Sequence, residues 1–153
     1  MTGAIDSLSI RRLSQRRVAE EQGQALWIAF GGVADQPWLH LLRPGFRHCF
    51  AALSDEAGWT VVEPLSGRLL VARLPVEAGF DLPDFYRRAG LRVLGPFRPE
   101  GPAMGPAPRR WPVLVPLTCV GLCRALLGTA APAAWTPWQL FQALGGQIEE
   151  NNQ

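Results

Sequence analysis

The stretch that decides the fold is Pro116-Leu-Thr-Cys-Val-Gly-Leu-Cys-Arg-Ala-Leu-Leu-Gly128. It predicts a short helix that opens with a cysteine, because Thr118 is a suitable N-cap and Gly128 a suitable C-terminal stop. Cys119 would then lie in the first turn, where unpaired N–H groups and the positive end of the helix dipole favour a thiolate. A cysteine in this position is a candidate nucleophile if a histidine lies within reach.

Of the two histidines in the chain, His48 is the better partner because it lies in a predicted strand. Alternation along that strand places His48 on the same face as Phe46 and Phe50. We expect this phenylalanine face to pack against the helices and to turn His48 toward them. The next strand ends at Glu63, whose carboxylate can hold the histidine ring in the correct tautomer. The sequence therefore predicts a Cys119–His48–Glu63 triad.

The rest of the chain predicts an α+β fold, a small antiparallel sheet packed by helices. Turn residues between apolar runs indicate the strands, and capped amphipathic runs indicate the helices. The predicted strands are residues 25–30, 46–53, 59–63, 68–74 and 91–94, and the predicted helices are residues 82–90, 119–127 and 137–144, the last stopped by Gly145-Gly146. We expect no regular element over residues 96–112, which are rich in proline.

Length and composition indicate one domain, residues 25–146, between a basic N-terminal arm, residues 1–24, and a polar tail, residues 147–153. With 48% apolar and 18% charged residues in 153, the chain is globular and large enough for a core. All 15 basic residues are arginines, but a net charge of +2 is too small to imply a polyanion, so we do not expect nucleic acid as a partner.

The N-terminus and the cysteines bear on the compartment. No apolar run is long enough to span a membrane, and no basic start precedes an apolar block, so we expect a cytoplasmic protein without membrane contact. Three cysteines, an odd number, argue against a disulfide framework. We also expect no cofactor.

Simpler interpretations of the same residues stay open. Cys49 and Cys123 suit the role of buried core residues, and a histidine among aromatic residues is often a hydrogen-bonded core residue. Together with Cys119 and His48 they could be imagined as a zinc site with three cysteines and one histidine. However, His48 and Cys49 are neighbours on opposite faces of a strand, so the four side chains cannot easily converge on one ion.

The run around Cys119, followed by Thr136-Pro-Trp-Gln-Leu140, resembles the C-terminal half of circularly permuted NlpC-type papain-like cysteine hydrolases. Members of that family carry a cysteine that opens a helix, then a Thr-Pro-x-x-Leu segment, with the histidine earlier at the start of a strand. The resemblance covers residues 26–144. It departs at Arg47, where the family has a small residue, and at Val120-Gly121, where a polar pair such as Ser-Glu is common. The chain also resembles small alphaproteobacterial or prophage proteins.

This resemblance implies a cysteine hydrolase of the amidase or peptidase type. Cys119 would attack an amide or ester carbonyl, His48 would move the proton, and Glu63 would orient His48. The implied substrate is a small peptide or amide, of which a cell-wall peptide is one example. We expect Trp111, Trp135 and Trp138 to wall the substrate groove, and the backbone N–H of Cys119 to help bind the oxyanion.

The competing hypothesis is a non-catalytic binding or assembly protein on the same fold, in a phage-like or other protein complex. It rests on the altered residues beside Cys119 and His48 and on the basic arm, which could hold a protein partner. Under this hypothesis Cys119 is a buried core residue. Contact between the Cys119 thiol and the His48 ring at a place that solvent reaches would discriminate the two.

Overall fold

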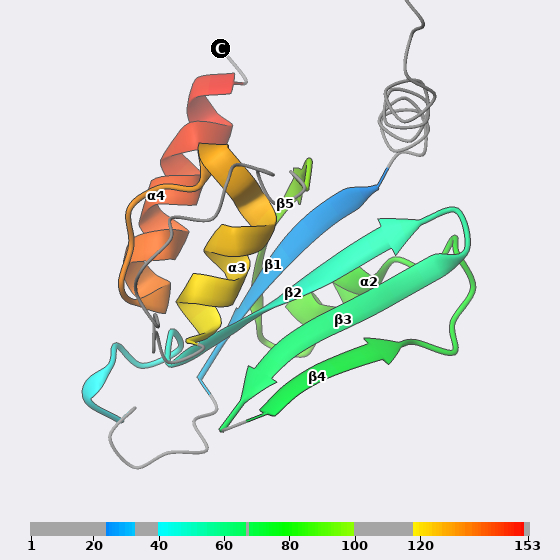
Figure 1. Ribbon diagram of the computed structural model, residues 1–153, viewed down its shortest axis with the longest axis horizontal. Coiled ribbons are helices and arrows are strands. Elements are labelled where there is room, and N and C mark those ends of the chain that lie inside the picture. The colour runs from blue at the N-terminus through cyan, green and yellow to red at the C-terminus, as the bar shows by residue number, and fades with distance from the viewer. Residues whose placement is uncertain (1–23, 33–39, 67, 100–117, 152–153) are drawn as a thin grey trace, which may run out of the picture.

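The computed structural model describes residues 24–32, 40–66, 68–99 and 118–151. In these ranges a five-stranded antiparallel sheet carries helices on both faces (Figure 1), which confirms the predicted α+β class. Most of the N-terminal arm and of the proline-rich loop, Trp111 included, lies outside the described residues.

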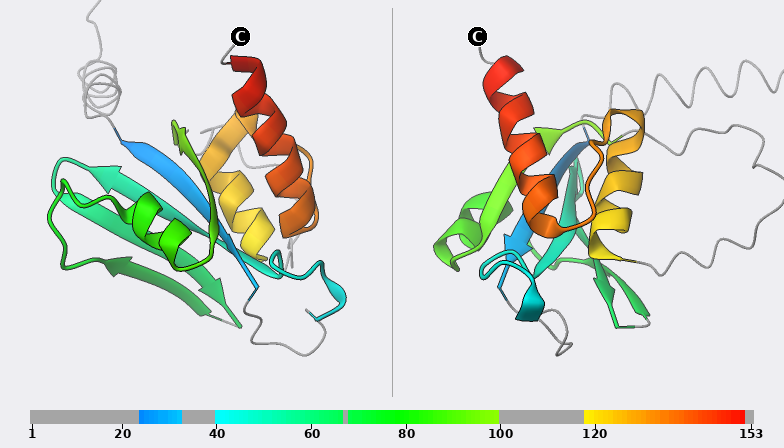
Figure 2. Two further views of the ribbon diagram at one scale, coloured as in Figure 1. Left: turned by 180° about the vertical axis from the view of Figure 1, so that it is seen from behind. Right: turned by 90° about the vertical axis from the view of Figure 1, so that its left-hand side faces the viewer.

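The sheet is a meander to which one strand is added at the far edge. Its order is β4-β3-β2-β1-β5, and every neighbouring pair is antiparallel. The strands are β1 Ala25–Gly31, β2 His48–Asp55, β3 Gly58–Leu65, β4 Arg68–Arg73 and β5 Arg92–Phe97; the helices are α2 Leu82–Arg88, α3 Cys119–Leu127 and α4 Pro137–Asn151, with a 3-10 turn η2 at Gly128–Ala130. Helix α2 covers one face of the sheet, and α3 and α4 cover the other (Figure 2).

Alternation along the strands divides the apolar residues between two cores. In β1, Leu26, Ile28 and Phe30 are buried toward α3 and α4, while Ala29 belongs to the core under α2. Phe30 meets the edge of the Phe141 ring from α4, with centroids 5.3 Å apart. A sheet covered on both faces needs this period-two division in its central strands.

Local capping signals confirm the predicted helix starts. The Gly121 N–H donates to Thr118 Oγ1 at 2.9 Å, and the Gln139 N–H donates to Thr136 Oγ1 at 3.2 Å. Gly128 ends α3 with a φ of 71°, a conformation that glycine adopts without steric cost. These contacts fix the first residue of α3 as Cys119.

Two predicted boundaries are wrong by more than two residues. Helix α4 does not stop at Gly145-Gly146 but continues to Asn151, so part of the predicted polar tail is helical. Glycine lowers helix stability without forbidding the helix, and the buried Leu140 and Leu144 anchor α4 on the sheet. Strand β5 extends to Phe97 through Pro96, which an edge strand tolerates at a register irregularity.

The predicted orientation of β2 is also wrong. Its residues in the core under α3 are Cys49 and Ala51, whereas Phe50 packs on the α2 side against Tyr86. Phe46, which precedes the strand, does pack toward α4, where its ring contacts Trp138. The small Cys49 and Ala51 leave room for a closely packed helix, while aromatic residues fill the space under the short α2.

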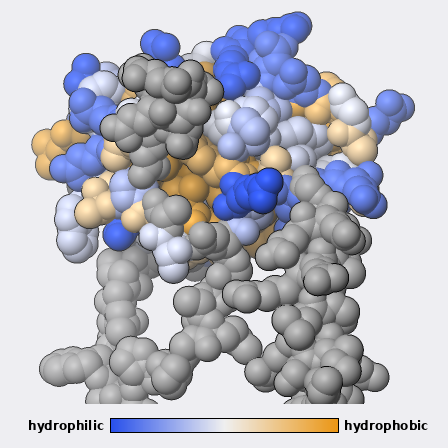
Figure 3. Space-filling model, turned by 90° about the horizontal axis from the view of Figure 1, so that it is seen from above, coloured by the Kyte–Doolittle hydropathy of each residue, from blue (hydrophilic) through white to orange (hydrophobic). Residues whose placement is uncertain are grey.

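Hydrophobic side chains also reach the surface. In the view from above, hydrophobic residues are visible near the centre of the surface, and hydrophilic residues lie around them (Figure 3). The edge strand β4 exposes Leu69, Leu70 and Val71. Within the described ranges, no helix combines the length and the apolar character needed to cross a bilayer.

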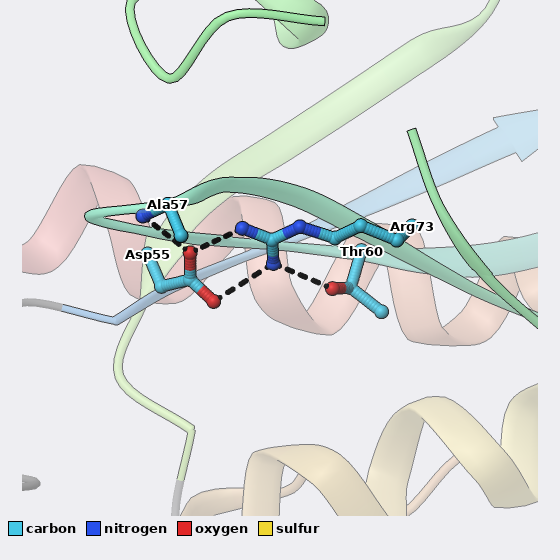
Figure 4. A network of polar contacts seen from close by, with 4 residues as sticks. All are labelled: Asp55, Ala57, Thr60 and Arg73. Carbon is cyan, nitrogen blue, oxygen red and sulfur yellow. Dashed lines mark hydrogen bonds and ion pairs between the residues drawn. The ribbon is translucent and has the colours of Figure 1, made fainter. Parts of the chain in front are cut away.

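The β2–β3 hairpin is held by one polar network (Figure 4). Arg73 of β4 donates two hydrogen bonds to the carboxylate of Asp55, at 2.7 and 2.9 Å, and a third to Thr60 Oγ1 at 3.0 Å. Asp55 also accepts from the Ala57 N–H across the turn at 2.8 Å. The bond to Arg73 lowers the pKa of Asp55 from 3.8 to about 2.

Replacing Gly95 with alanine should destabilise the protein. The φ of Gly95 is 140°, and an added Cβ would lie 2.8 Å from the Leu26 carbonyl oxygen and from the Trp27 ring. We expect Gly95→Ala to reduce the free energy of unfolding by about 2 kcal/mol in urea titrations. The control is Gly146→Ala in α4, where the added Cβ meets nothing within 4 Å and should stabilise the helix by about 0.5–1 kcal/mol. A Gly95→Ala variant that is at least as stable as the wild type would contradict a steric requirement for glycine at position 95.

The Asp55 network should contribute a pH-dependent stability. Because the pKa of Asp55 is lowered on folding, its contribution is full above about pH 4 and is lost as the pH falls toward 2. We expect Asp55→Asn to lower the urea midpoint at pH 6, and the difference from the wild type to narrow at pH 3. Asp84→Asn, which breaks only an exposed contact with Arg88, is the control. A difference that does not change with pH would argue against an ionised Asp55.

Candidate active site

Cys119 is the first residue of α3, and its position follows from the local sequence. The Thr118 hydroxyl accepts from the Gly121 N–H, and the Thr118 carbonyl accepts from the Leu122 N–H. The helix geometry leaves the N–H groups of Cys119 and Val120 without an intrahelical acceptor. The Cys119 side chain is half-buried. A sulfur placed here lies beside backbone donors at the positive end of a helix.

His48 is the first residue of β2, at the end of the sheet where β2 and β3 cease to pair. The last paired residues are Ala51 and Val62, and Pro64 follows with no N–H to continue the ladder. Beyond that point β3 pairs only with β4. In Figure 1 the first turn of α3 lies beside the start of β2. The cysteine and the histidine are therefore brought to the same end of the sheet from its two sides.

Glu63 takes the place that the sequence predicted for it. His48 Nε2 lies 3.0 Å from Glu63 Oε1, with exposed side-chain fractions of 17% and 27%. The carboxylate accepts from this nitrogen, which leaves Nδ1 as the ring nitrogen for Cys119. Both groups are shielded by protein yet reachable by solvent. The arrangement gives the histidine ring one orientation and one tautomer.

Aromatic residues on the α2 side support the histidine. The ring of His48 stacks on Phe50 with centroids 6.3 Å apart, and Phe50 meets Tyr86 edge to face at 5.3 Å. Burial raises the pKa of the Tyr86 hydroxyl, and the nearby charge of Glu63 raises it further. Tyr86 therefore borders the same carboxylate that orients His48. Sequence reasoning missed this residue because only the packing of α2 brings it close.

The environment of Cys119 favours a thiolate. A hydrogen bond from the Cys49 thiol is the largest cause, and together with a bond to His48 and one from the Cys49 backbone it outweighs burial, so the pKa of Cys119 falls from 9.0 to about 4. The Cys49 thiol changes in the opposite sense. Its bond to Cys119 raises its pKa well above 9.0, so it stays protonated and acts as the donor.

His48 carries the matching positive charge. Burial lowers the pKa of the ring, but the hydrogen bond to Cys119 and the negative charges of Cys119 and Glu63 outweigh it, and the net shift is upward from 6.5. Cys119 therefore loses its proton at a lower pH than His48 does. Between the two pKa values the site holds a thiolate and an imidazolium in contact, an arrangement typical of cysteine nucleophiles.

Cys49 has a larger part than the sequence indicated. It is fully buried, as expected of a core cysteine, yet its thiol and its backbone N–H both bond the Cys119 sulfur. Its sulfur also lies 3.9 Å from that of Cys123. The sequence did indicate this position, because Cys49 is the neighbour of His48 on the strand. A residue next to His48 lies near Cys119 when His48 contacts Cys119.

The predicted groove tryptophans are distributed differently. Trp138 packs in an aromatic cluster with Phe46 and Phe141, and the Arg43 guanidinium lies 3.7 Å above its ring. This cluster holds the segment that leads into His48. Trp135 is 87% exposed, and Trp111 lies outside the described residues. A place in a substrate groove for Trp135 and Trp138 stays a prediction.

The two departures around the cysteine have structural reasons. Val120 is 3% exposed and belongs to the core between α3 and the sheet, where a polar residue would lose its hydration. A Cβ on Gly121 would lie 2.9 Å from the Thr118 hydroxyl that caps the helix. Both residues thus support the placement of the helix that carries Cys119.

Comparison with protein-family models, with characterised proteins and with solved structures returns no match. Among the described residues, no group of three or more histidine, cysteine or acidic side chains is arranged to hold a metal ion.

Iodoacetamide should react with Cys119 first, and at low pH. Because the pKa of Cys119 is about 4, we expect the labelling rate to change little from pH 8 to pH 5.5, measured by peptide mass analysis. His48→Ala removes a bond and a charge that lower this pKa, so labelling at pH 5.5 should slow about tenfold or more.

The matched control is Cys123→Ala, which removes a buried thiol from the same helix and should leave the Cys119 rate unchanged. A wild-type rate that rises about tenfold per pH unit between pH 6 and 8 would indicate an ordinary thiol and contradict the ion pair.

Proposed function

We propose that this protein is a cysteine-dependent hydrolase of the amidase or peptidase type, with Cys119 as nucleophile, His48 as acid and base, and Glu63 as the positioning residue. The observation that carries the proposal is the three-part contact at one end of the sheet. A helix-terminal thiolate meets an imidazolium, and a carboxylate 3.0 Å from Nε2 fixes that imidazolium. These are the parts that nucleophilic acyl transfer needs.

The chemistry follows from these positions. The Cys119 sulfur attacks the carbonyl carbon of an amide or ester, and the negative charge moves to the carbonyl oxygen. The N–H groups of Cys119 and Val120, left without intrahelical acceptors, can donate to this oxygen. His48 then gives its Nδ1 proton to the leaving amine or alcohol, and a thioester to Cys119 remains. Neutral His48 takes a proton from water, which attacks the thioester and releases the acid.

The resemblance to circularly permuted NlpC-type hydrolases supports the same proposal. The histidine strand precedes the cysteine helix in this chain, the reverse of the cysteine-first order of papain-like enzymes, as a circular permutation requires. The substrate class follows from that resemblance, a small peptide or amide such as a cell-wall peptide. The binding-protein hypothesis predicted a buried Cys119 without a role, and the partly exposed sulfur bonded to His48 favours the hydrolase instead.

The direct test is formation of an acyl-enzyme. The purified full chain is incubated with 4-nitrophenyl acetate and with N-acyl dipeptide 4-nitroanilides, and intact mass is measured. We expect an acyl group on Cys119 and release of nitrophenol or nitroaniline, lost in Cys119→Ala and retained in Cys123→Ala. A Cys119 that reacts with iodoacetamide but is acylated by no substrate of either class would overturn the hydrolase.

The pH profile separates the two ionisations. We expect kcat/KM to rise through about pH 4 as Cys119 loses its proton, and to fall above 6.5 as His48 does. The charge of Glu63 helps to raise the pKa of His48, so Glu63→Gln should move the upper limb to lower pH while keeping an acceptor for Nε2. Glu56→Gln in the exposed β2–β3 turn is the control. An unchanged upper limb in Glu63→Gln would contradict the assigned role.

A further inference from the structure

In the hydrolytic cycle the thiol of Cys49 acts only as a hydrogen-bond donor to Cys119. It is 0% exposed, yet it bonds the Cys119 sulfur through its own sulfur and through its backbone N–H. All three cysteines are free thiols. A hydrogen-bond donor of any kind could lower the pKa of Cys119, but a donor that is itself a thiol also allows a bond to form between the two sulfurs.

The surrounding packing holds the two sulfurs together. Cys49 belongs to the core between β2 and α3, and Cys119 packs against that same core from the first turn of the helix. Strand β2 is the strand with which α3 makes most of its contacts. Cys49 also touches Cys123 one turn further along α3, with sulfurs 3.9 Å apart. The Cys49 sulfur thus lies against the first and second turns of the helix.

We propose that Cys49 is a resolving thiol: when a hydroperoxide oxidises Cys119, Cys49 attacks the product and closes a Cys49–Cys119 disulfide. The proposal rests on the proposed function in using the same nucleophile. It adds a modification site, a co-reactant class and a second state of the enzyme, in which the nucleophile is withdrawn reversibly. The proposal gives a chemical role to Cys49, the buried cysteine that bonds Cys119.

The two steps balance. The Cys119 thiolate attacks the peroxide oxygen and breaks the O–O bond, giving the sulfenic acid of Cys119. The departing alkoxide or hydroxide takes the His48 proton, and the peroxide is reduced by two electrons. The Cys49 sulfur then attacks the Cys119 sulfur, the S–O bond breaks, and the hydroxyl leaves with the Cys49 proton as water. A small peroxide needs access only to Cys119, because the second step occurs inside the protein.

The structure favours Cys49 over Cys123 as the partner. Cys49 bonds the Cys119 sulfur directly, whereas Cys123 contacts Cys49 from the next turn of the same helix. A disulfide between β2 and α3 also links two elements that are already packed together. The expected consequence is protection, since a sulfenic acid that is not captured is oxidised further to a sulfinic acid that thiols do not reduce.

The test uses the full chain, reduced and then exposed to a two-fold excess of hydrogen peroxide. Remaining thiols are blocked with N-ethylmaleimide before intact mass and peptide analysis. We expect the wild type to lose 2 hydrogens and, when N-ethylmaleimide is added to the unfolded chain, two of its three thiols, with a Cys49–Cys119 linked peptide that dithiothreitol releases. Cys123→Ala should give the same product, which also identifies the linked residue of α3.

Cys49→Ala and Cys49→Ser should give no disulfide, a sulfenic acid that dimedone traps, and at least ten times more Cys119 sulfinic acid than the wild type. Two variants are used because one could disturb the core. A urea midpoint equal to that of the wild type reports that each variant still folds. Iodoacetamide labelling of the reduced variants is measured at pH 8, because loss of the Cys49 hydrogen bond raises the pKa of Cys119 and would slow labelling at lower pH. A wild type that accumulates Cys119 sulfinic acid while Cys49 remains a free thiol would overturn the proposal, as would a disulfide that persists in both Cys49 variants.

The two proposals fail in different ways. If Cys119 of the reduced wild type is no more reactive than an ordinary thiol, both proposals are overturned, because the hydrolase and the disulfide both need a reactive Cys119. A reactive Cys119 that is acylated by substrate but forms no disulfide would overturn the resolving thiol alone.

Discussion

Keeping a negative charge on a mostly buried sulfur is the constraint on which the rest of this structure depends. Burial alone would raise the pKa of Cys119, so the charge needs donors and a positive neighbour that the fold holds in place. The first turn of α3 supplies backbone N–H groups, and the start of β2 supplies Cys49 and His48. Neither element could do this alone, because the first turn of α3 carries the thiolate and the start of β2 carries the cation.

The two faces of the sheet position different residues of this site. The face under α3 and α4 holds the cysteine through a core of aliphatic residues and thiols. The face under α2 holds the histidine through stacked aromatic rings, from Phe50 to Tyr86. The histidine from one face and the cysteine from the other come together where β2 and β3 cease to pair. Pro64 suits this end of β3, because proline has no N–H to continue the hydrogen bonding between the strands. The point at which β2 and β3 stop pairing thus determines where the site lies.

Local signals were sufficient to predict the elements and the three residues that meet at the end of the sheet. Thr118 and Gly128 define α3 through contacts within a few residues, and turns define the β2–β3–β4 meander. The faces of β2 could not be predicted in the same way, since alternation divides residues into two sets without stating which helix covers each. The role of Cys49 and the approach of Tyr86 depend on packing between distant segments. Helix α4 continues through Gly145 and Gly146 because the burial of Leu144 outweighs the low helix propensity of glycine.

The order of strands has a consequence for how the chain reaches its native state. Contacts between neighbours in sequence close short loops and form early, whereas contacts between distant segments wait for them. His48 and Glu63 are only 15 positions apart on adjacent strands, but the Cys49–Cys123 contact that docks the helix spans 74 positions. We expect the meander to assemble with its histidine and acid in place before the helix docks. During that interval the cysteine lacks the neighbours that lower its pKa, so a nascent chain would acquire its reactive sulfur last.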